Sequence, residues 1–146
     1  MENIMSAKKL SIEKYRNAYE QAIQSLNQLE RAIDWLDSDP QAEDRWGRLD
    51  AVAKRFETSF EYIWKALRAA LILKGIEIYG PKDAIARAGT QDWIDDLDEW
   101  ENFMYSRNAG VHDYFGLSSE EYADVARTFL KSARSVLNNV PTPESE

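Results

Sequence analysis

The fold is decided by residues 56–67, which read FETSFEYIWKAL. Apolar side chains recur there every three or four residues, which is the spacing of one helix face and not of a strand. Aromatic residues at this spacing form a core far more often than a ligand site, so we predict that they are buried. The pattern extends outward to about Lys74, where Gly75 is a candidate C-cap. Its apolar positions are Leu49, Val52, Phe56, Phe60, Ile63, Trp64, Leu67 and Leu71.

Helical patterns continue on both sides of this stretch. A first helix is expected after a polar leader, with Ser11 as its N-cap and residues 37–40 as its end. The central helix then starts at Pro40, behind Asp39, or in the polar run that follows. A capping box predicts the last helix, and residues 76–79, which have no partner strand, are interpreted as a connection. The later helices are expected at 81–88, from Trp93 onward and after Ser118, with Glu121 completing the capping box.

Composition limits the class of protein. The 146 residues are 44% hydrophobic, which suits one domain with its own core, and we expect that domain at 1–140 with a disordered tail at 141–146. Cysteine is absent, which excludes disulfides and thiolate metal sites and fits a cytoplasmic protein. No apolar run is long enough for a membrane span. The net charge of −8 argues against broad electrostatic binding of nucleic acid, so a local basic cleft would have to override it.

These patterns together predict an all-α fold, an antiparallel four-helix bundle with a short extra helix. The chain has five tryptophans and twelve other aromatic residues, which is more than a bundle of this size must bury. We therefore expect a homodimer. No membrane or DNA partner is expected.

A polar motif lies at residues 107–114, which read RNAGVHDY and hold the only histidine of the chain. Histidine can both accept and donate a proton near neutral pH, and arginine suits phosphate oxygens. Arg107 also falls on an apolar seam formed by Trp93, Leu97, Trp100 and Met104. A charge on such a seam is costly unless it is paired or has a function. The motif therefore indicates phosphodiester chemistry.

The spacing of Arg107 and His112 imposes a condition on this site. Five residues turn an ideal helix by about 500°, so the two side chains converge only if the helix ends or bends between them. Gly110 is expected to provide that break as a left-handed C-cap. The alternative is that Arg107 merely complements the helix dipole and that His112 is an ordinary loop residue.

An acidic run covers residues 92–101 of the same region. Its six carboxylates are interpreted as a solvated face or a docking surface for a basic partner rather than as a metal site. No cofactor is expected. The carboxylates are Asp92, Asp95, Asp96, Asp98, Glu99 and Glu101.

The order Arg107, Asn108, three residues, His112, one residue, Tyr114 resembles the HEPN superfamily, and more narrowly the HepT-type toxins and the substrate-binding proteins encoded beside minimal nucleotidyltransferases. The doubled Phe-Glu followed by Trp-Lys at residues 56–65 is similar to a second pattern of the substrate-binding family. The resemblance spans the chain from about Arg55 to the end of the last helix.

The resemblance implies a metal-independent endoribonuclease that cleaves RNA, tRNA or mRNA, in a cleft between two chains. Arg107 and His112 would be catalytic and Asn108 supporting. A minimal nucleotidyltransferase antitoxin would neutralise the toxin by transferring AMP to Tyr114. Two alternatives stay open, a non-catalytic docking subunit of the nucleotidyltransferase and a bundle that merely dimerises.

Overall fold

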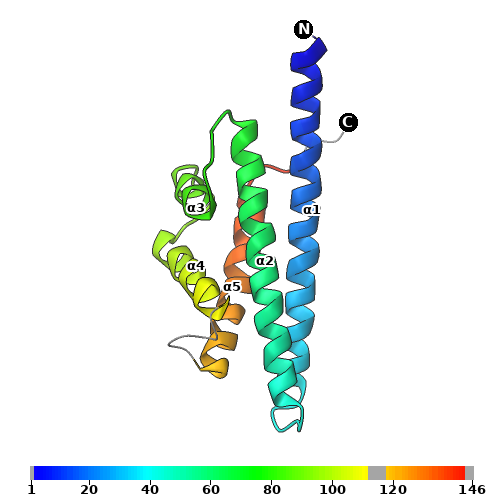
Figure 1. Ribbon diagram of the computed structural model, residues 1–146, viewed down its shortest axis with the longest axis vertical. Coiled ribbons are helices and arrows are strands. Elements are labelled where there is room, and N and C mark those ends of the chain that lie inside the picture. The colour runs from blue at the N-terminus through cyan, green and yellow to red at the C-terminus, as the bar shows by residue number, and fades with distance from the viewer. Residues whose placement is uncertain (1, 112–117, 144–146) are drawn as a thin grey trace.

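The computed structural model describes residues 2–111 and 118–143, and every element within them is a helix. The first two helices form a long antiparallel hairpin, the fifth packs against both, and the third and fourth lie along the flank of the second (Figure 1). The all-α prediction and its bundle-like packing are confirmed for this part of the chain, while the homodimer stays a prediction. The helices are α1 (Glu2–Ser38), α2 (Arg45–Leu73), α3 (Pro81–Thr90), α4 (Leu97–Val111) and α5 (Ser119–Asn139).

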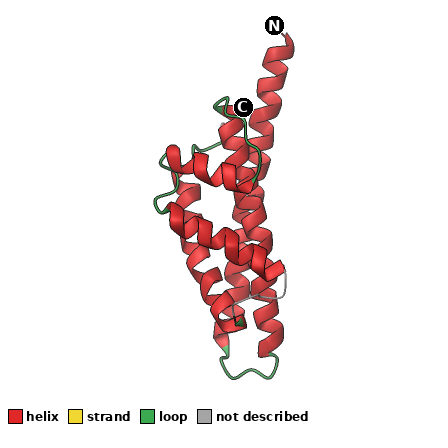
Figure 2. Ribbon diagram, turned by 60° about the vertical axis from the view of Figure 1, so that its left-hand side comes forward, coloured by secondary structure: helices red, strands yellow, loops and turns green. Residues whose placement is uncertain are grey.

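Helix α1 is longer than the sequence predicted. It begins at Glu2, so residues 2–10 are helical and Ser11 lies inside the helix instead of capping it. The leader contains alanine, leucine, methionine, lysine and glutamate, which all favour helix, and this preference overrides the local signal of the serine. The first turns extend beyond the other helices, and the α1–α2 connection lies at the opposite end (Figure 2). No helix in the described residues is long and apolar enough to cross a membrane.

Helix α2 confirms the central prediction, because all eight expected apolar positions are buried. It starts at Arg45, in the polar run, and not at Pro40. The residues before it form a turn, in which the Ala42 N–H donates to the Asp39 carbonyl at 3.1 Å. At the other end Gly75 adopts a φ of +80°. Its N–H and that of Ile76 donate to carbonyls of the last turn at 2.9 and 3.1 Å, which is a Schellman C-cap.

The core is a cluster of aromatic rings around Phe129 of α5. Phe56 packs edge to face against it with ring centroids 5.1 Å apart, and Phe103 and Trp100 of α4 do so at 5.3 and 5.5 Å. Edge-to-face pairs contribute about 0.5–1.5 kcal/mol each beyond the area they bury. Three helices thus share one aromatic centre, which sets the position of α4 relative to α2.

The start of α4 differs from its prediction. Asp92 has a φ of +63°, so the chain leaves α3 through a left-handed residue and α4 begins only at Leu97, where the Asp96 carboxylate caps the Glu99 N–H at 3.1 Å. Trp93 is buried, but it belongs to the connection between α3 and α4 and not to a helix. Leu97 is 38% exposed. Both therefore leave the predicted seam, which keeps Trp100 and the half-buried Met104.

The C-terminal part of α4 also corrects an expectation. The helix runs through Gly110 to Val111, so Gly110 is not the predicted C-cap. Glycine inside a helix costs only about 1 kcal/mol relative to alanine, which the neighbouring turns can offset. α3 likewise continues past Ala88 to Thr90.

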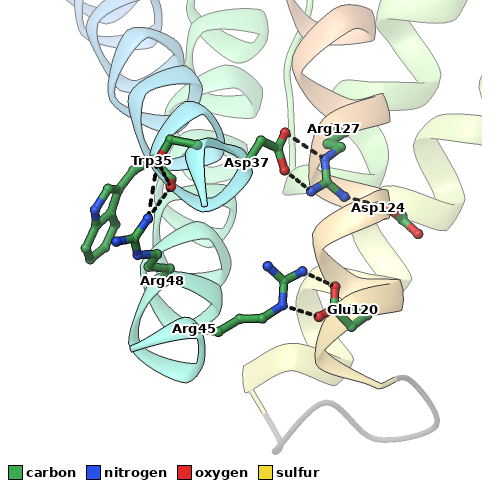
Figure 3. A network of polar contacts seen from close by, with 8 residues as sticks. Trp35, Asp37, Arg45, Arg48, Glu120, Asp124 and Arg127 are labelled. Carbon is green, nitrogen blue, oxygen red and sulfur yellow. Dashed lines mark hydrogen bonds and ion pairs between the residues drawn. The ribbon is translucent and has the colours of Figure 1, made fainter. Parts of the chain in front are cut away.

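Ion pairs fix the start of α5 against the α1–α2 hairpin (Figure 3). Arg45 at the start of α2 donates twice to Glu120, at 2.7 and 2.8 Å, and this hydrogen bonding lowers the pKa of the Glu120 carboxyl. Arg127, two turns further along α5, binds Asp37 of α1 at 2.5 Å. The predicted capping box of Ser118 and Glu121 is present. The first turns of α5 thus contact both helices of the hairpin through ion pairs.

Two tyrosines of α1 donate hydrogen bonds to the end of α5 and to the residues that follow it. Tyr15 is 2% exposed and donates to the Pro141 carbonyl, and Tyr19 donates to the Leu137 carbonyl at 3.2 Å. Burial, with a smaller contribution from Tyr19, raises the pKa of the Tyr15 phenol. Pro141 thus lies next to α1. Residues 144–146 lie outside the described residues, so disorder of the tail stays a prediction there.

Tyr15→Phe should lower the free energy of unfolding by about 0.5–1.5 kcal/mol at neutral pH, because one hydrogen bond is lost. Since the folded-state pKa is raised, the Tyr15 phenol stabilises the wild type below about pH 10 and loses that contribution as the pH rises above it. The deficit of the variant should therefore shrink in urea unfolding at about pH 11. A deficit that is constant or grows with pH would contradict this assignment.

Candidate functional site

The side chain of Arg107 lies between α4 and α2. Its Nη2 donates to Oε1 of Glu61 on α2, and its Nη1 donates to the Asn108 side-chain oxygen at 3.2 Å. The two ion-paired side chains are about equally shielded, with 26% of Arg107 and 31% of Glu61 exposed. Arg107 is thus a half-buried, paired cation on the apolar flank of α4, as its seam position indicated.

Glu61 holds more than one partner. Its second carboxylate oxygen accepts a hydrogen bond from the Trp64 indole at 3.2 Å and lies 3.8 Å from the Lys65 ammonium. The i, i+4 spacing of Glu61 and Lys65 indicates this local pair. The contact of Glu61 with Arg107, 46 positions away, was not predicted from the sequence. The signal was available in principle, since a cation on an apolar seam requires a carboxylate nearby.

One atom of Arg107 is left without a partner. Its Nε is buried and has no hydrogen-bond acceptor among the described residues. A buried N–H that finds no acceptor costs about 1–3 kcal/mol. Within the described residues Arg107 is therefore incompletely satisfied, which makes it a candidate for a role in binding or chemistry.

The other members of the motif are Asn108, His112 and Tyr114. Asn108 is exposed and contacts Arg107 through its side-chain oxygen. His112 and Tyr114 lie outside the described residues, so their geometry relative to Arg107 stays a prediction. In the sequence, His112 and Tyr114 follow Arg107 by five and seven positions.

The acidic run is largely solvated. Asp92, Asp95, Asp96, Asp98 and Glu101 are exposed, and only Glu99 turns inward, where it accepts a hydrogen bond from Ser132 of α5. The described ranges hold no group of three or more acidic, histidine or cysteine side chains arranged to hold a metal. Five of the six carboxylates thus form an exposed band of negative charge before and along the start of α4.

Comparison with known families gives one match. The model of a family described as "Nucleotidyltransferase substrate binding protein like" matches residues 12–141. That span includes Glu61 and the whole motif at 107–114. A comparison with curated proteins gives no match.

The coupling between Glu61 and Arg107 can be measured with a double-mutant cycle of Glu61→Gln and Arg107→Met in urea unfolding. The pair is partly shielded, so we expect a coupling free energy of about 1 kcal/mol. A matched cycle with Glu57→Gln, one turn earlier on α2, should give less than about 0.5 kcal/mol. If Glu61→Gln costs the same in the Arg107→Met background as in the wild type, the ion pair does not stabilise the fold.

Proposed function

Because the chain belongs to the nucleotidyltransferase substrate-binding protein-like family, we propose that it is the toxin of a toxin–antitoxin pair with a nucleotidyltransferase and cleaves RNA without a metal. The observation that carries this is Arg107. It is a cation held on an apolar flank by Glu61, with its Nε buried and unpartnered within the described residues, five positions before the only histidine. A docking protein has no evident need for this costly arrangement.

Arg107 is positioned to meet a phosphate. Its guanidinium has five N–H donors, and among the described residues Glu61 and Asn108 accept from two of its nitrogens. Donors therefore remain on a side chain whose orientation is already set. Fixed donors aimed at developing negative charge are the largest single contribution in many enzymes, worth about a hundredfold to a thousandfold in rate for one donor.

The reaction is an internal transesterification. The ribose 2′-hydroxyl attacks the adjacent phosphorus, the bond to the 5′-oxygen breaks, and the products are a 2′,3′-cyclic phosphate and a 5′-hydroxyl. His112 takes the proton of the attacking hydroxyl or supplies one to the leaving oxygen, a role worth about a hundredfold to ten-thousandfold. Arg107 stabilises the charge on the non-bridging oxygens, and Asn108 holds the guanidinium.

Two chains would complete the site. One histidine per chain cannot be base and acid at the same moment, but a two-fold interface would bring two Arg107 and His112 sets to one cleft. α4 is a candidate element of such an interface, because Leu97 and Tyr105 expose 38% and 63% of their surface on it. Exposed apolar side chains on one element favour an interface.

The control is exerted through Tyr114. The partner nucleotidyltransferase transfers AMP from ATP to the phenol oxygen, forming a phosphodiester and releasing pyrophosphate. The attached phosphate would pair with Arg107 and the adenosine would occupy the path of the RNA backbone. Both effects switch the toxin off.

A second candidate function is a non-catalytic docking subunit of the nucleotidyltransferase. The net charge of −8 and the exposed carboxylates of residues 92–101 favour it, because they would attract a basic partner and repel RNA. The two functions differ in one observable, which is RNA cleavage by the isolated protein.

Arg107→Ala or His112→Ala should reduce cleavage of a labelled RNA by about a hundredfold or more in the presence of a chelator, while far-ultraviolet circular dichroism stays that of the wild type. Arg87→Ala, which removes an exposed arginine of α3, is the matched control and should cleave normally. Unchanged cleavage by both motif variants would contradict the mechanism assigned to Arg107 and His112. No cleavage by the wild type would favour the docking subunit.

Light scattering should give twice the chain mass of 16.9 kDa at micromolar concentration. Tyr105→Glu should shift the protein toward the monomer, because it places a charge in the proposed interface, whereas Tyr79→Glu, at a tyrosine that is 80% exposed after α2, should not. A wild type that is strictly monomeric removes the composite site.

Mass spectrometry of the wild type produced together with its nucleotidyltransferase should show added AMP, and the modified protein should no longer cleave RNA. Tyr114→Phe should stay unmodified and active, while Tyr79→Phe should behave as the wild type. The regulatory role of Tyr114 is wrong if Tyr114→Phe is modified and silenced as well as the wild type is.

A further inference from the structure

A hollow of about 630 Å³ lies between α1 and α2, which run side by side in Figure 1. Ile78, from the connection that follows α2, also lines it. Three cations line it, Lys14 from α1 and Lys65 and Arg68 from α2, and no carboxylate is among its lining residues. This α1–α2 groove is therefore a local excess of positive charge on a chain whose net charge is −8.

The groove adjoins the site around Arg107. Lys65 is one helical turn beyond Glu61 on α2, and its ammonium lies 3.8 Å from the carboxylate that also holds Arg107. Arg68 follows on the same side of α2, and Lys14 lines the groove from α1. The Glu61 carboxylate thus joins Arg107 to Lys65. Beyond it, Lys65, Arg68 and Lys14 line the groove in the manner of a track for a chain of phosphates.

The walls of the groove also suit nucleobases. The Arg68 guanidinium lies 5.0 Å from the centre of the Trp64 ring, so the ring restricts its orientation. Half-buried Tyr62 and the apolar Ala69 and Ile78 form more of the surface. Aromatic and guanidinium faces beside a cationic track are what single-stranded nucleic acid binds without sequence preference.

We propose that the α1–α2 groove binds the single-stranded RNA substrate beside the cleavage site, with backbone phosphates on Lys14, Lys65 and Arg68 and a base against Tyr62. The proposal rests on the ribonuclease function proposed above, and it supplies the local basic surface that an acidic ribonuclease needs. Outside the groove the acidic surface repels RNA, so the strand is directed toward Arg107.

The test measures binding separately from cleavage. Fluorescence anisotropy with a short single-stranded RNA whose 2′-hydroxyls are methylated reports affinity alone, because the attacking group is blocked. Lys14→Gln with Arg68→Gln should weaken binding about tenfold or more and flatten its salt dependence, since about 0.7 counterions are released per phosphate contact on a single strand. Lys14→Gln alone changes an exposed side chain and should show a smaller loss in the same direction.

The matched control is Lys54→Gln with Lys131→Gln, which removes two exposed lysines of α2 and α5 that do not line the groove. It should bind as the wild type. Equal weakening in the control, or none in the groove variants, overturns the proposal while leaving cleavage by the wild type untouched. Groove-dependent binding without any cleavage would instead refute the ribonuclease and keep the groove. A free mononucleotide that competes as well as the RNA at equal concentration would identify a nucleotide pocket and overturn the RNA track.

Discussion

Glu61 of α2 and Arg107 of α4 form an ion pair in the flank of the bundle, and the arrangement of the candidate site depends on it. The aromatic cluster around Phe129 sets how α4 lies on α2, but apolar packing does not orient a charged side chain. The carboxylate does so, because a half-buried guanidinium is stable where its charge is matched and its N–H groups find acceptors. The same carboxylate binds the Trp64 indole and Lys65, so one side chain connects the seam of α4 with the groove beside α1.

Periodicity predicted the core well and the helix ends less well. The stripe of α2 was predicted in full because burial on one face imposes a spacing that no local signal can disturb. Ser11 and Trp93 show the opposite case. Ser11 has the chemistry of a cap but lies among strong helix formers, and Trp93 has the chemistry of a core residue but is buried from a connection. Such ends depend on competition between local signals and tertiary packing.

Spacing also explains why the sequence indicated the position of Arg107 in the candidate site but not its partner. An arginine on an apolar seam can be read directly from the spacing of α4, and the structure places it there, half-buried and paired. Its partner cannot be read from spacing, because periodicity assigns residues to faces and not faces to each other, and Glu61 also has a sufficient local partner in Lys65. Only the packing of α4 on α2 brings the two motifs together. The groove was missed likewise, since Lys14 and Arg68 belong to different helices.

The acidity of the chain and a nucleic-acid substrate are compatible if charge is segregated. The exposed carboxylates near α4 and the cations of the α1–α2 groove lie on different elements, so one protein can offer an acidic surface to a partner and a basic track to RNA. The chemistry assigned to Arg107 and His112 is decided most directly by the ends of the RNA fragments. Mass spectrometry of products made with a chelator present should show a 2′,3′-cyclic phosphate and a 5′-hydroxyl. Fragments ending in a 5′-phosphate and a 3′-hydroxyl would contradict the account, because a neighbouring 2′-hydroxyl cannot produce them.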